Sequence, residues 1–124
     1  MLQRYLALNT MVFEDITMHF VIMNNVFNSD LKVHLKYDLK GSSFQRQSMD
    51  LTKDKPFENF DFAIPMKDLD FKYRKENIYL LKEDREMILK QIENDSKFLA
   101  SKQINDYSFL IGIHDPGKIG LIII

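Results

Sequence analysis

The sequence contains no cysteine. A chain without thiols has no disulfide framework, no cysteine-ligated zinc site and no cysteine nucleophile. This composition is compatible with a reducing compartment, where disulfides are rare. The chain has 124 residues, of which 45% are hydrophobic and 28% charged. These values are those of an ordinary globular chain that is long enough for one domain with a modest core.

The sequence also has little net charge and no long apolar run. Its formal net charge is −1, so nucleic acid is not an expected partner, and contact with an anionic surface would depend on local basic patches. No apolar run approaches the roughly 18 residues of a membrane-spanning helix. The N-terminal "MLQRYLALN" lacks the signal-peptide order of a basic start, a long apolar middle and a small-residue cleavage site.

Extended segments dominate the first part of the chain. Residues 5–13 and 17–27 are rich in Val, Ile, Phe, Met and Leu, which predicts a β-hairpin whose second strand is the more buried. Residues 33–40 alternate apolar and polar side chains, and this period of two predicts a half-buried strand.

The second part changes from loop to helix and back to strand. Residues 49–66 are polar, contain prolines and have no clear period, so we expect a loop. Residues 75–102 carry a stripe at helical spacing, which predicts a long helix. The stripe consists of Leu81, Ile88, Ile92, Asp95 and Leu99. An extended segment beginning at Asp106, a "DPGK" turn and a final strand "IGLIII" follow. This order predicts an α+β fold, with an antiparallel sheet and a long helix.

The segment "LKYDLKGSSFQR" is the first candidate site. Lys40 offers an ammonium group to a phosphate oxygen, and Gly41 lets the backbone approach a ligand closely. Ser42 and Ser43 add hydroxyl groups and backbone N–H donors. The alternative is a strand leading into a polar turn, and the pattern alone favours it. The segment is not a Walker loop, because G-x-x-x-x-G-K-[ST] is absent.

Three aspartates give weaker signals. Asp106 precedes a strand, where a rigid scaffold could present its carboxylate to a cleft, although a lone Asp there is more often a turn former. Asp68 and Asp70 in "KDLDF" could bind a cation or cap the approach to the helix, and capping is the stronger interpretation. The three histidines are scattered, so no zinc or two-metal site is expected.

Five segments carry further information in their order along the chain. They are "VIMNNVF", "KYDLKGSSFQR", "KDLDF", "QIENDSKFL" and "INDYSFLIGIHD". Together they resemble the phosphatidylinositol phosphate kinase family, which has a VMxN strand, a YDLKGS motif, a KDLDF box, a helix ending D-S-x-F-L and an I-M-D-Y-S-L-L-x-G-I-H segment. The chain departs from this pattern at Asn105, where Met is usual, and at Phe109, where Leu is usual. Neither change removes a charge that the chemistry needs.

The resemblance implies a partial kinase-like fold. Residues 1–49 would form part of a β-rich N-terminal lobe that includes the DLKGS strand, and residues 50–124 part of a C-terminal lobe with the long helix and the DYS segment. A nucleotide cleft would lie between the lobes. Met23 and Asn24 fall where the family's hinge edges the adenine pocket.

The resemblance also implies roles for polar residues. Asp106 matches the catalytic-loop Asp, which is expected to orient or deprotonate the inositol hydroxyl. Lys40 matches the DLKGS Lys, expected to contact a transferring or substrate phosphate, and Asp38 matches the first residue of that motif. Arg46 matches a basic residue expected to meet the phosphate already on the lipid. No residue of this chain is assigned to a metal.

The implied function is a lipid kinase that uses ATP and Mg²⁺. It would transfer the γ-phosphate to a phosphatidylinositol monophosphate, as a phosphatidylinositol-4-phosphate 5-kinase does, mainly through positioning and charge neutralisation. We expect a cytoplasmic protein that is peripheral at membranes, with a phosphoinositide as its partner, no nucleic acid partner, and a homodimer in the full-length protein.

Some parts of such a kinase are not recognisable in the sequence. They are the Gly-rich loop, the nucleotide Lys and the metal-binding Asp. The apolar end "GLIII" must be buried or paired. We therefore expect an internal piece of a longer kinase or a truncated reading frame, inactive toward lipid on its own. The alternative is a catalytically dead remnant that binds a phosphoinositide or a partner through Lys36, Lys40 and Arg46.

Overall fold

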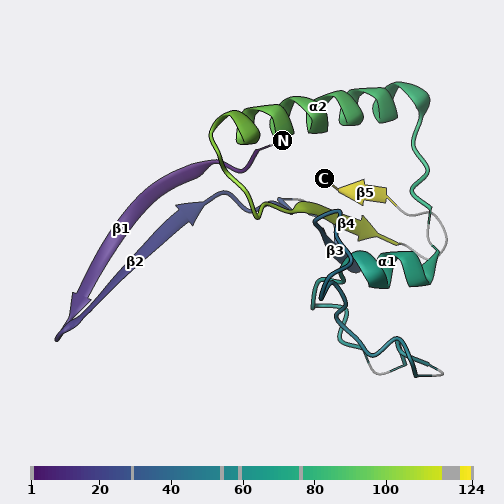
Figure 1. Ribbon diagram of the computed structural model, residues 1–124, viewed down its shortest axis with the longest axis horizontal. Coiled ribbons are helices and arrows are strands. Elements are labelled where there is room, and N and C mark those ends of the chain that lie inside the picture. Colours follow the sequence, from purple (N-terminus) through teal and green to yellow (C-terminus); the bar gives the residue numbers. More distant parts are fainter. Residues whose placement is uncertain are drawn as a thin grey trace.

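The computed structural model describes residues 2–28, 30–53, 55–58, 60–75, 77–115 and, by their backbone alone, 121–123. These residues form two antiparallel sheets and two helices, which confirms the predicted α+β class (Figure 1). In chain order the elements are β1 (Tyr5–Phe13), β2 (Ile16–Met23), β3 (Leu35–Leu39), α1 (Asp68–Arg74), α2 (Lys82–Ser101), β4 (Phe109–His114) and β5 (Leu121–Ile123).

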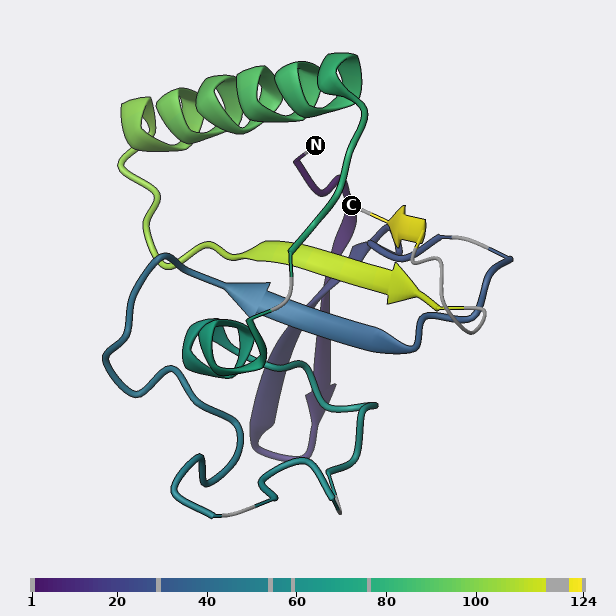
Figure 2. The same cartoon turned by 90° about the vertical axis from the view of Figure 1, so that its right-hand side faces the viewer.

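The predicted hairpin is present, but it is not buried. β1 and β2 pair from Tyr5 opposite Met23 to Phe13 opposite Ile16, and in Figure 1 they project away from the other elements. In the view of Figure 2 they pass behind β3 and β4. Every residue of β2 is exposed, so the expectation of a more buried second strand was wrong. The physical reason is that the hairpin contacts no other described helix or strand.

The second strand also ends earlier than predicted. β2 stops at Met23. Beyond it, the side-chain oxygen of Asn25 accepts a hydrogen bond from the backbone N–H of Phe27 at 3.1 Å. This local turn takes the place of further strand pairing.

The second sheet has the order β3-β4-β5 and carries the small core. Tyr37 in β3 lies opposite Ile111 in β4, and both are buried together with Met49 and Met66. Met66 extends the sheet beside β3, because its N–H donates to Lys36 O and its carbonyl accepts from Asp38 N, both at 2.8 Å. The sheet thus joins β3, from the predicted N-terminal lobe (residues 1–49), to β4 and β5, from the predicted C-terminal lobe (residues 50–124). The division at residues 49 and 50 stays a prediction.

The predicted long helix is α2, and it begins later than expected. Lys75 has a left-handed φ of 51° and ends α1, while Leu81 is extended with ψ 151° directly before α2. The motif "KDLDF" therefore forms most of a separate short helix instead of leading into the long one. Four residues of the predicted stripe, Ile88, Ile92, Asp95 and Leu99, are half-buried within α2. The fifth, Leu81, lies before the helix and is 72% exposed.

The C-terminal part of the chain was predicted as a turn followed by a strand. The predicted "DPGK" turn lies outside the described residues, whereas the last predicted strand is confirmed as β5, paired with β4. Of the helices in the described part of the chain, neither has the length and apolar character needed to cross a bilayer.

Candidate functional site

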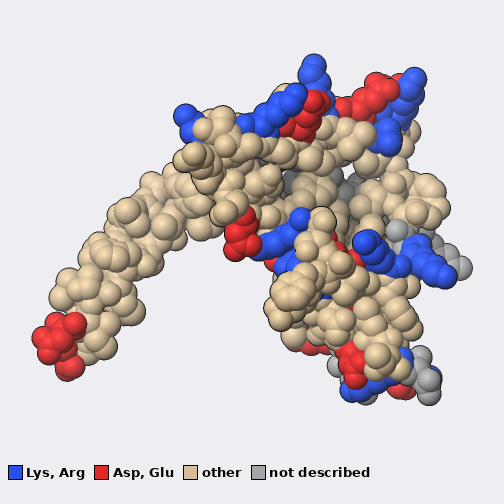
Figure 3. Space-filling model, viewed as in Figure 1, with Lys and Arg blue, Asp and Glu red and all other residues tan. Residues whose placement is uncertain are grey.

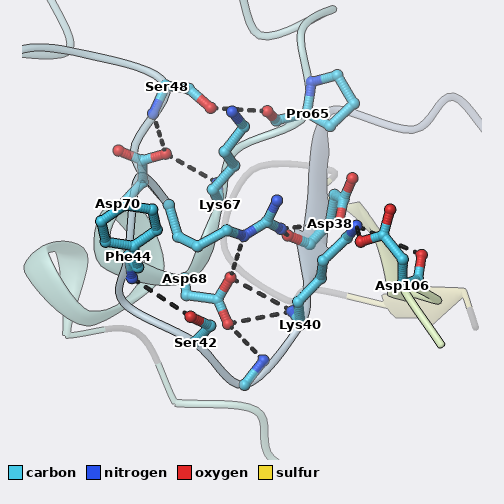
Figure 4. Close-up of polar contacts among 12 residues, drawn as sticks. Asp38, Lys40, Ser42, Phe44, Ser48, Pro65, Lys67, Asp68, Asp70 and Asp106 are labelled. Carbon is cyan, nitrogen blue, oxygen red and sulfur yellow. Dashed lines mark hydrogen bonds and ion pairs between the residues drawn. The ribbon is translucent and has the colours of Figure 1, made fainter.

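The first pair of the site lies where β3 ends and β4 is about to begin. Lys40 directly follows β3, and Asp106 lies in the loop before β4. Because the two strands are antiparallel, these positions meet in space. The Lys40 ammonium donates to the Asp106 carboxylate and lies 3.4 Å from its backbone carbonyl oxygen (Figure 4). The structure therefore brings together two residues that the sequence singled out from separate motifs.

The environment of Asp106 sets its protonation state. Its side chain is 82% exposed, and that of Lys40 is 25% exposed. The hydrogen bond from Lys40, and then the positive charge of Lys40, lower the pKa of the Asp106 carboxyl below its ordinary value, with a smaller contribution from Arg46. Asp106 is thus ionised at neutral pH. Such a carboxylate is suited to orienting a hydroxyl group and is a weak proton acceptor.

Arg46 links two further carboxylates. Its Nε donates to Asp68 Oδ2 at 2.9 Å, and its Nη2 donates to Asp38 Oδ1 at 2.9 Å and to the Asp38 carbonyl. These contacts, first the hydrogen bond to Asp68, raise the pKa of Arg46 against the opposing effect of burial. The Arg46 side chain is only 13% exposed. The structure places it between protein carboxylates, and its contact with a lipid phosphate stays a prediction.

Asp68 binds the segment that the sequence marked as a phosphate binder. Its Oδ1 accepts from Gly41 N at 2.8 Å and from Lys40 N at 3.2 Å. Gly41 was expected to let the backbone approach a ligand closely, and in the structure its N–H donates to a carboxylate of the protein. Burial raises the pKa of Asp68, but the hydrogen bonds from Arg46, Gly41 and Lys40 outweigh it and leave the pKa lowered.

This role of Asp68 was missed at the sequence level. The spacing of Asp68 and Asp70 indicated a shared face or a cap, whereas the partner amides lie 27 and 28 residues away in the chain. The contacts of Asp68 can be recognised only in the folded chain, where "KDLDF" lies beside the end of β3.

Asp70 has a different set of contacts. Its Oδ2 accepts from Lys67 N and from Ser48 N, each at 2.8 Å, which confirms the capping interpretation for this residue. Asp68 and Asp70 therefore bind different segments and do not converge on one point. Within the residues that the structure describes, no group of three or more His, Cys, Asp or Glu side chains is arranged to hold a metal ion.

A cavity of about 900 Å³ adjoins the Lys40 side of the site. Asp38, Lys40 and Gly41 line one part of it, and Ile92 and Leu99 of α2 line another. Its volume falls in the range of small-molecule sites, roughly 300 to 1,000 Å³. The lining over α2 is mixed, because Asp95 and Ser96 join Ile92, Phe98 and Leu99, and the lining at the end of β3 includes the charged Asp38 and Lys40.

The predicted adenine-pocket residues do not line this cavity, although their neighbour Val26 does. Met23 ends β2, and the backbone N–H of Asn24 donates to Arg4 O at 3.2 Å. The side-chain oxygen of Asn24 accepts from Arg4 N at 2.6 Å. Asn24 is therefore bound to the segment before β1, and the adenine contact of Met23 and Asn24 stays a prediction.

Known proteins resemble this chain over most of its length. The family model described as phosphatidylinositol-4-phosphate 5-kinase matches residues 1–119. The phosphatidylinositol 5-phosphate 4-kinase type-2 gamma of Danio rerio is 35% identical over 118 residues, which is 95% of this chain and 27% of the relative. The human type-2 beta protein gives the same identity and shares. A probable phosphatidylinositol phosphate kinase of Dictyostelium discoideum is 42% identical over 100 residues, 80% of this chain and 13% of the relative. The chain spans about a quarter of the length of the type-2 relatives.

Proposed function

The chain belongs to the phosphatidylinositol phosphate kinase family, and from this premise we propose that Lys40 and Asp106 form the acceptor side of a phosphoryl-transfer site. The acceptor is a hydroxyl group of a phosphatidylinositol monophosphate, and the donor is ATP. The observation that carries the proposal is the contact between Lys40 and Asp106, which come from motifs 66 residues apart.

Each residue of the pair has a role that follows from its charge. The ionised Asp106 accepts a hydrogen bond from the inositol hydroxyl and so directs that oxygen toward the transferred phosphoryl group. The ammonium of Lys40 contacts a phosphate oxygen and offsets its negative charge. Fixed charges of this kind, together with alignment of the reacting atoms, supply most of the catalysis in phosphoryl transfer.

The pair must also rearrange when the lipid binds. Without ligand, Lys40 donates to Asp106. A phosphate oxygen competes for the same ammonium, and the carboxylate that it displaces becomes available to the hydroxyl. Charge-assisted hydrogen bonds of similar strength are exchanged, so this rearrangement has a low net energetic cost.

The cavity supports a nucleotide, and the described residues do not support a metal site. ATP would supply the γ-phosphoryl group, with apolar residues such as Ile92 and Leu99 beside the base and Lys40 near the phosphates. The described part of the chain gathers no set of three metal-binding side chains. None of these described residues is therefore proposed as a ligand of Mg²⁺.

We propose phosphatidylinositol 5-phosphate as the first acceptor to test. The type-2 relatives are named as 5-phosphate 4-kinases, whereas the family model and the sequence-based expectation favour the 4-phosphate as acceptor. Both monophosphates therefore belong in the assay. The proposed place of action is the cytoplasmic surface of a membrane, with peripheral attachment.

A second candidate function is phosphoinositide binding without turnover. It is favoured by the lowered pKa of Asp106, because Lys40 makes that carboxylate a weaker base. Both candidates use Lys40 as the phosphate contact. They differ in whether bound lipid becomes phosphorylated.

The experiment combines vesicle binding with phosphate transfer. The chain is mixed with phosphatidylcholine vesicles that contain phosphatidylinositol 5-phosphate, phosphatidylinositol 4-phosphate or plain phosphatidylinositol. Co-sedimentation measures binding, and labelled ATP with Mg²⁺ measures transfer. We expect preferential binding to monophosphate vesicles.

The outcomes separate the candidates. Transfer that Asp106→Asn abolishes supports the kinase function, and preferential binding without transfer supports the binding module. Equal binding to monophosphate and plain phosphatidylinositol vesicles contradicts both functions.

A further inference from the structure

Asp68 is a buried carboxylate that, among the described residues, binds several groups of one short segment. Within Lys40 to Arg46, it accepts from two backbone N–H groups and from the Arg46 guanidinium (Figure 4). Its side chain is 8% exposed. A carboxylate this deeply buried is strongly destabilising when its partners are removed. Asp68 and the segment 40–46 are thus joined by three hydrogen-bonding groups of that segment.

Asp68 is itself fixed relative to β3. On one side, Met66 pairs with β3 through Lys36 O. On the other side, the N–H of Leu69 donates to Arg46 O at 2.8 Å. The residues on both sides of Asp68 are thus tied to the strand that carries Asp38 and to the loop that follows it.

This arrangement determines where the Lys40 side chain begins. Lys40 follows the last residue of β3, and Gly41 turns the chain with a left-handed φ of 70°. The amides of both residues converge on one oxygen of Asp68. A lysine stem is long and flexible, so the position of its ammonium depends on how firmly its backbone is held. From this fixed start, the ammonium reaches Asp106.

We propose that Asp68 is a positioning residue that holds the Lys40 backbone so that its ammonium meets Asp106, and that holds Arg46 against Asp38. Its consequence for lipid binding rests on the proposed function. The positioning itself concerns only groups of this chain and can be tested without lipid.

The test uses the pKa of the Asp106 carboxyl as a reporter of Lys40. It is measured by carbon NMR in the wild-type chain, in Asp68→Asn and in Lys40→Met. Removing Lys40 removes the main cause of the lowered pKa, so the pKa of Asp106 rises in that variant. If Asp68 positions Lys40, Asp68→Asn also raises the pKa of Asp106.

The direction of the change separates positioning from direct electrostatics. Removing the negative charge of Asp68 without moving Lys40 would stabilise the ionised Asp106 and lower its pKa. Loss of the Lys40 contact acts in the opposite direction. A rise in the pKa of Asp106 therefore supports the inference, and an unchanged or lowered pKa in a folded Asp68→Asn chain overturns it.

The matched control is Asp50→Asn. Asp50 also accepts a backbone N–H, from Thr52 at 3.1 Å, and it lies in the loop after the site. We expect this variant to leave the pKa of Asp106 unchanged. If circular dichroism shows that Asp68→Asn is unfolded, Asp68→Glu takes its place, because it keeps the charge but moves the carboxylate by one methylene. We expect the pKa of Asp106 to rise in Asp68→Glu as well. A pKa of Asp106 in that variant equal to the wild-type value would overturn the inference.

A binding arm distinguishes this inference from the proposed function. The same variants are added to vesicles that contain phosphatidylinositol 5-phosphate. In Asp68→Asn, a raised pKa of Asp106 with weaker binding supports both proposals, because the Lys40 ammonium is then displaced from the lipid phosphate as well as from Asp106. A raised pKa with wild-type binding supports the positioning role and contradicts the use of Lys40 as the lipid contact.

Discussion

Asp68 and Asp106 are both ionised at neutral pH, but only Asp68 is buried. The difference matters because an exposed ion pair is weakened by solvent and salt, whereas a buried one depends strongly on each partner. Lys40 and Asp106 can therefore exchange partners during binding. The contacts of Asp68 with Arg46 belong to the permanent structure.

The buried carboxylate predicts a specific loss of stability in acid. The pKa of Asp68 in the folded chain lies below its ordinary value of 3.8. Its ionised form thus stabilises the fold at pH values above the unfolded pKa, and this contribution is lost as the pH falls through the folded pKa. We expect urea unfolding to show that Asp68→Asn is less stable than wild type near neutral pH, and that the difference shrinks in acid.

Asp50→Asn is again the control for this measurement. The pKa of Asp50 is also lowered, by the Thr52 hydroxyl and then by its N–H, but Asp50 is exposed. Its replacement should change stability much less. A stability difference for Asp68→Asn that is the same at every pH would contradict the assigned charge state.

The sequence was informative about individual residues where a motif named them. Lys40 and Asp106 were selected by motif order, and the structure brings them into contact. The partners of Arg46 were not predictable. They depend on β3 and α1 lying side by side, and residue spacing does not encode this long-range packing.

At the scale of elements, β4 depends on one glycine. A Cβ atom built on Gly112 would lie 2.9 Å from ring carbons of Phe27 and 3.1 Å from a methyl group of Val33. Real Cβ contacts are essentially never shorter than 3.0 Å. The segment after β2 therefore packs directly on the backbone of β4.

This contact predicts the effect of Gly112→Ala. We expect the substitution to lower the free energy of unfolding by about 1 to 3 kcal/mol, the usual cost of overpacking. Phe27→Ala removes the ring and should make the added methyl group less costly. Urea unfolding of both single variants and the double variant measures this coupling. Additive effects would contradict a direct clash with Phe27.

Gly41→Ala provides the comparison for Gly112→Ala. No atom lies within 4 Å of a Cβ built on Gly41, so only its left-handed φ is unfavourable for alanine. We expect a cost of about 1 kcal/mol, with no dependence on Phe27.

The types of the main elements could be predicted from periodicity, but several boundaries could not. The α2 stripe was clear because one face of that helix is half-buried, and the alternation of β3 indicated a strand although both of its faces are at least half-buried. The starts and ends of elements depend on single backbone angles, such as the left-handed Lys75. They also depend on local hydrogen bonds, such as the Asn25 turn that follows β2.

At the scale of the whole molecule, the exposed surface is unusually large. The accessible surface is 9939 Å², whereas a compact monomer of this mass exposes roughly 7,000 Å². The hairpin contributes much apolar surface, since Leu8 is 72% exposed and Val12 is 66% exposed. Figure 3 shows it as an uncharged arm with acidic side chains only at its tip, near Glu14 and Asp15.

This surface predicts concentration-dependent self-association of the chain. Exposed apolar patches of this kind promote association. We expect analytical ultracentrifugation to show association that weakens when the opposed pair Leu8 and Val21 is replaced by lysine. The control is Leu89→Lys, because Leu89 is an exposed residue of α2 outside the hairpin, and this substitution should have little effect on association. A chain that stays monomeric at all concentrations would contradict this prediction.

The exposure of the hairpin could not be predicted from its sequence. Apolar residues in a strand show which side chains are suited to burial. They do not show whether another part of the protein covers those side chains. The order of the motifs indicated the resemblance to a kinase family. It did not reveal how much apolar surface would remain uncovered.

The most direct test of the proposed site compares two substitutions whose effects on lipid binding should have opposite signs. Lys40→Ala removes the phosphate contact and should weaken binding to phosphatidylinositol 5-phosphate vesicles by about tenfold, the loss expected for one charge-assisted hydrogen bond. Asp106→Asn removes the competing carboxylate, frees the Lys40 ammonium and should strengthen binding. Weaker binding in both variants, or no change in either, would contradict the account of Lys40 as a phosphate contact that Asp106 holds until the lipid arrives.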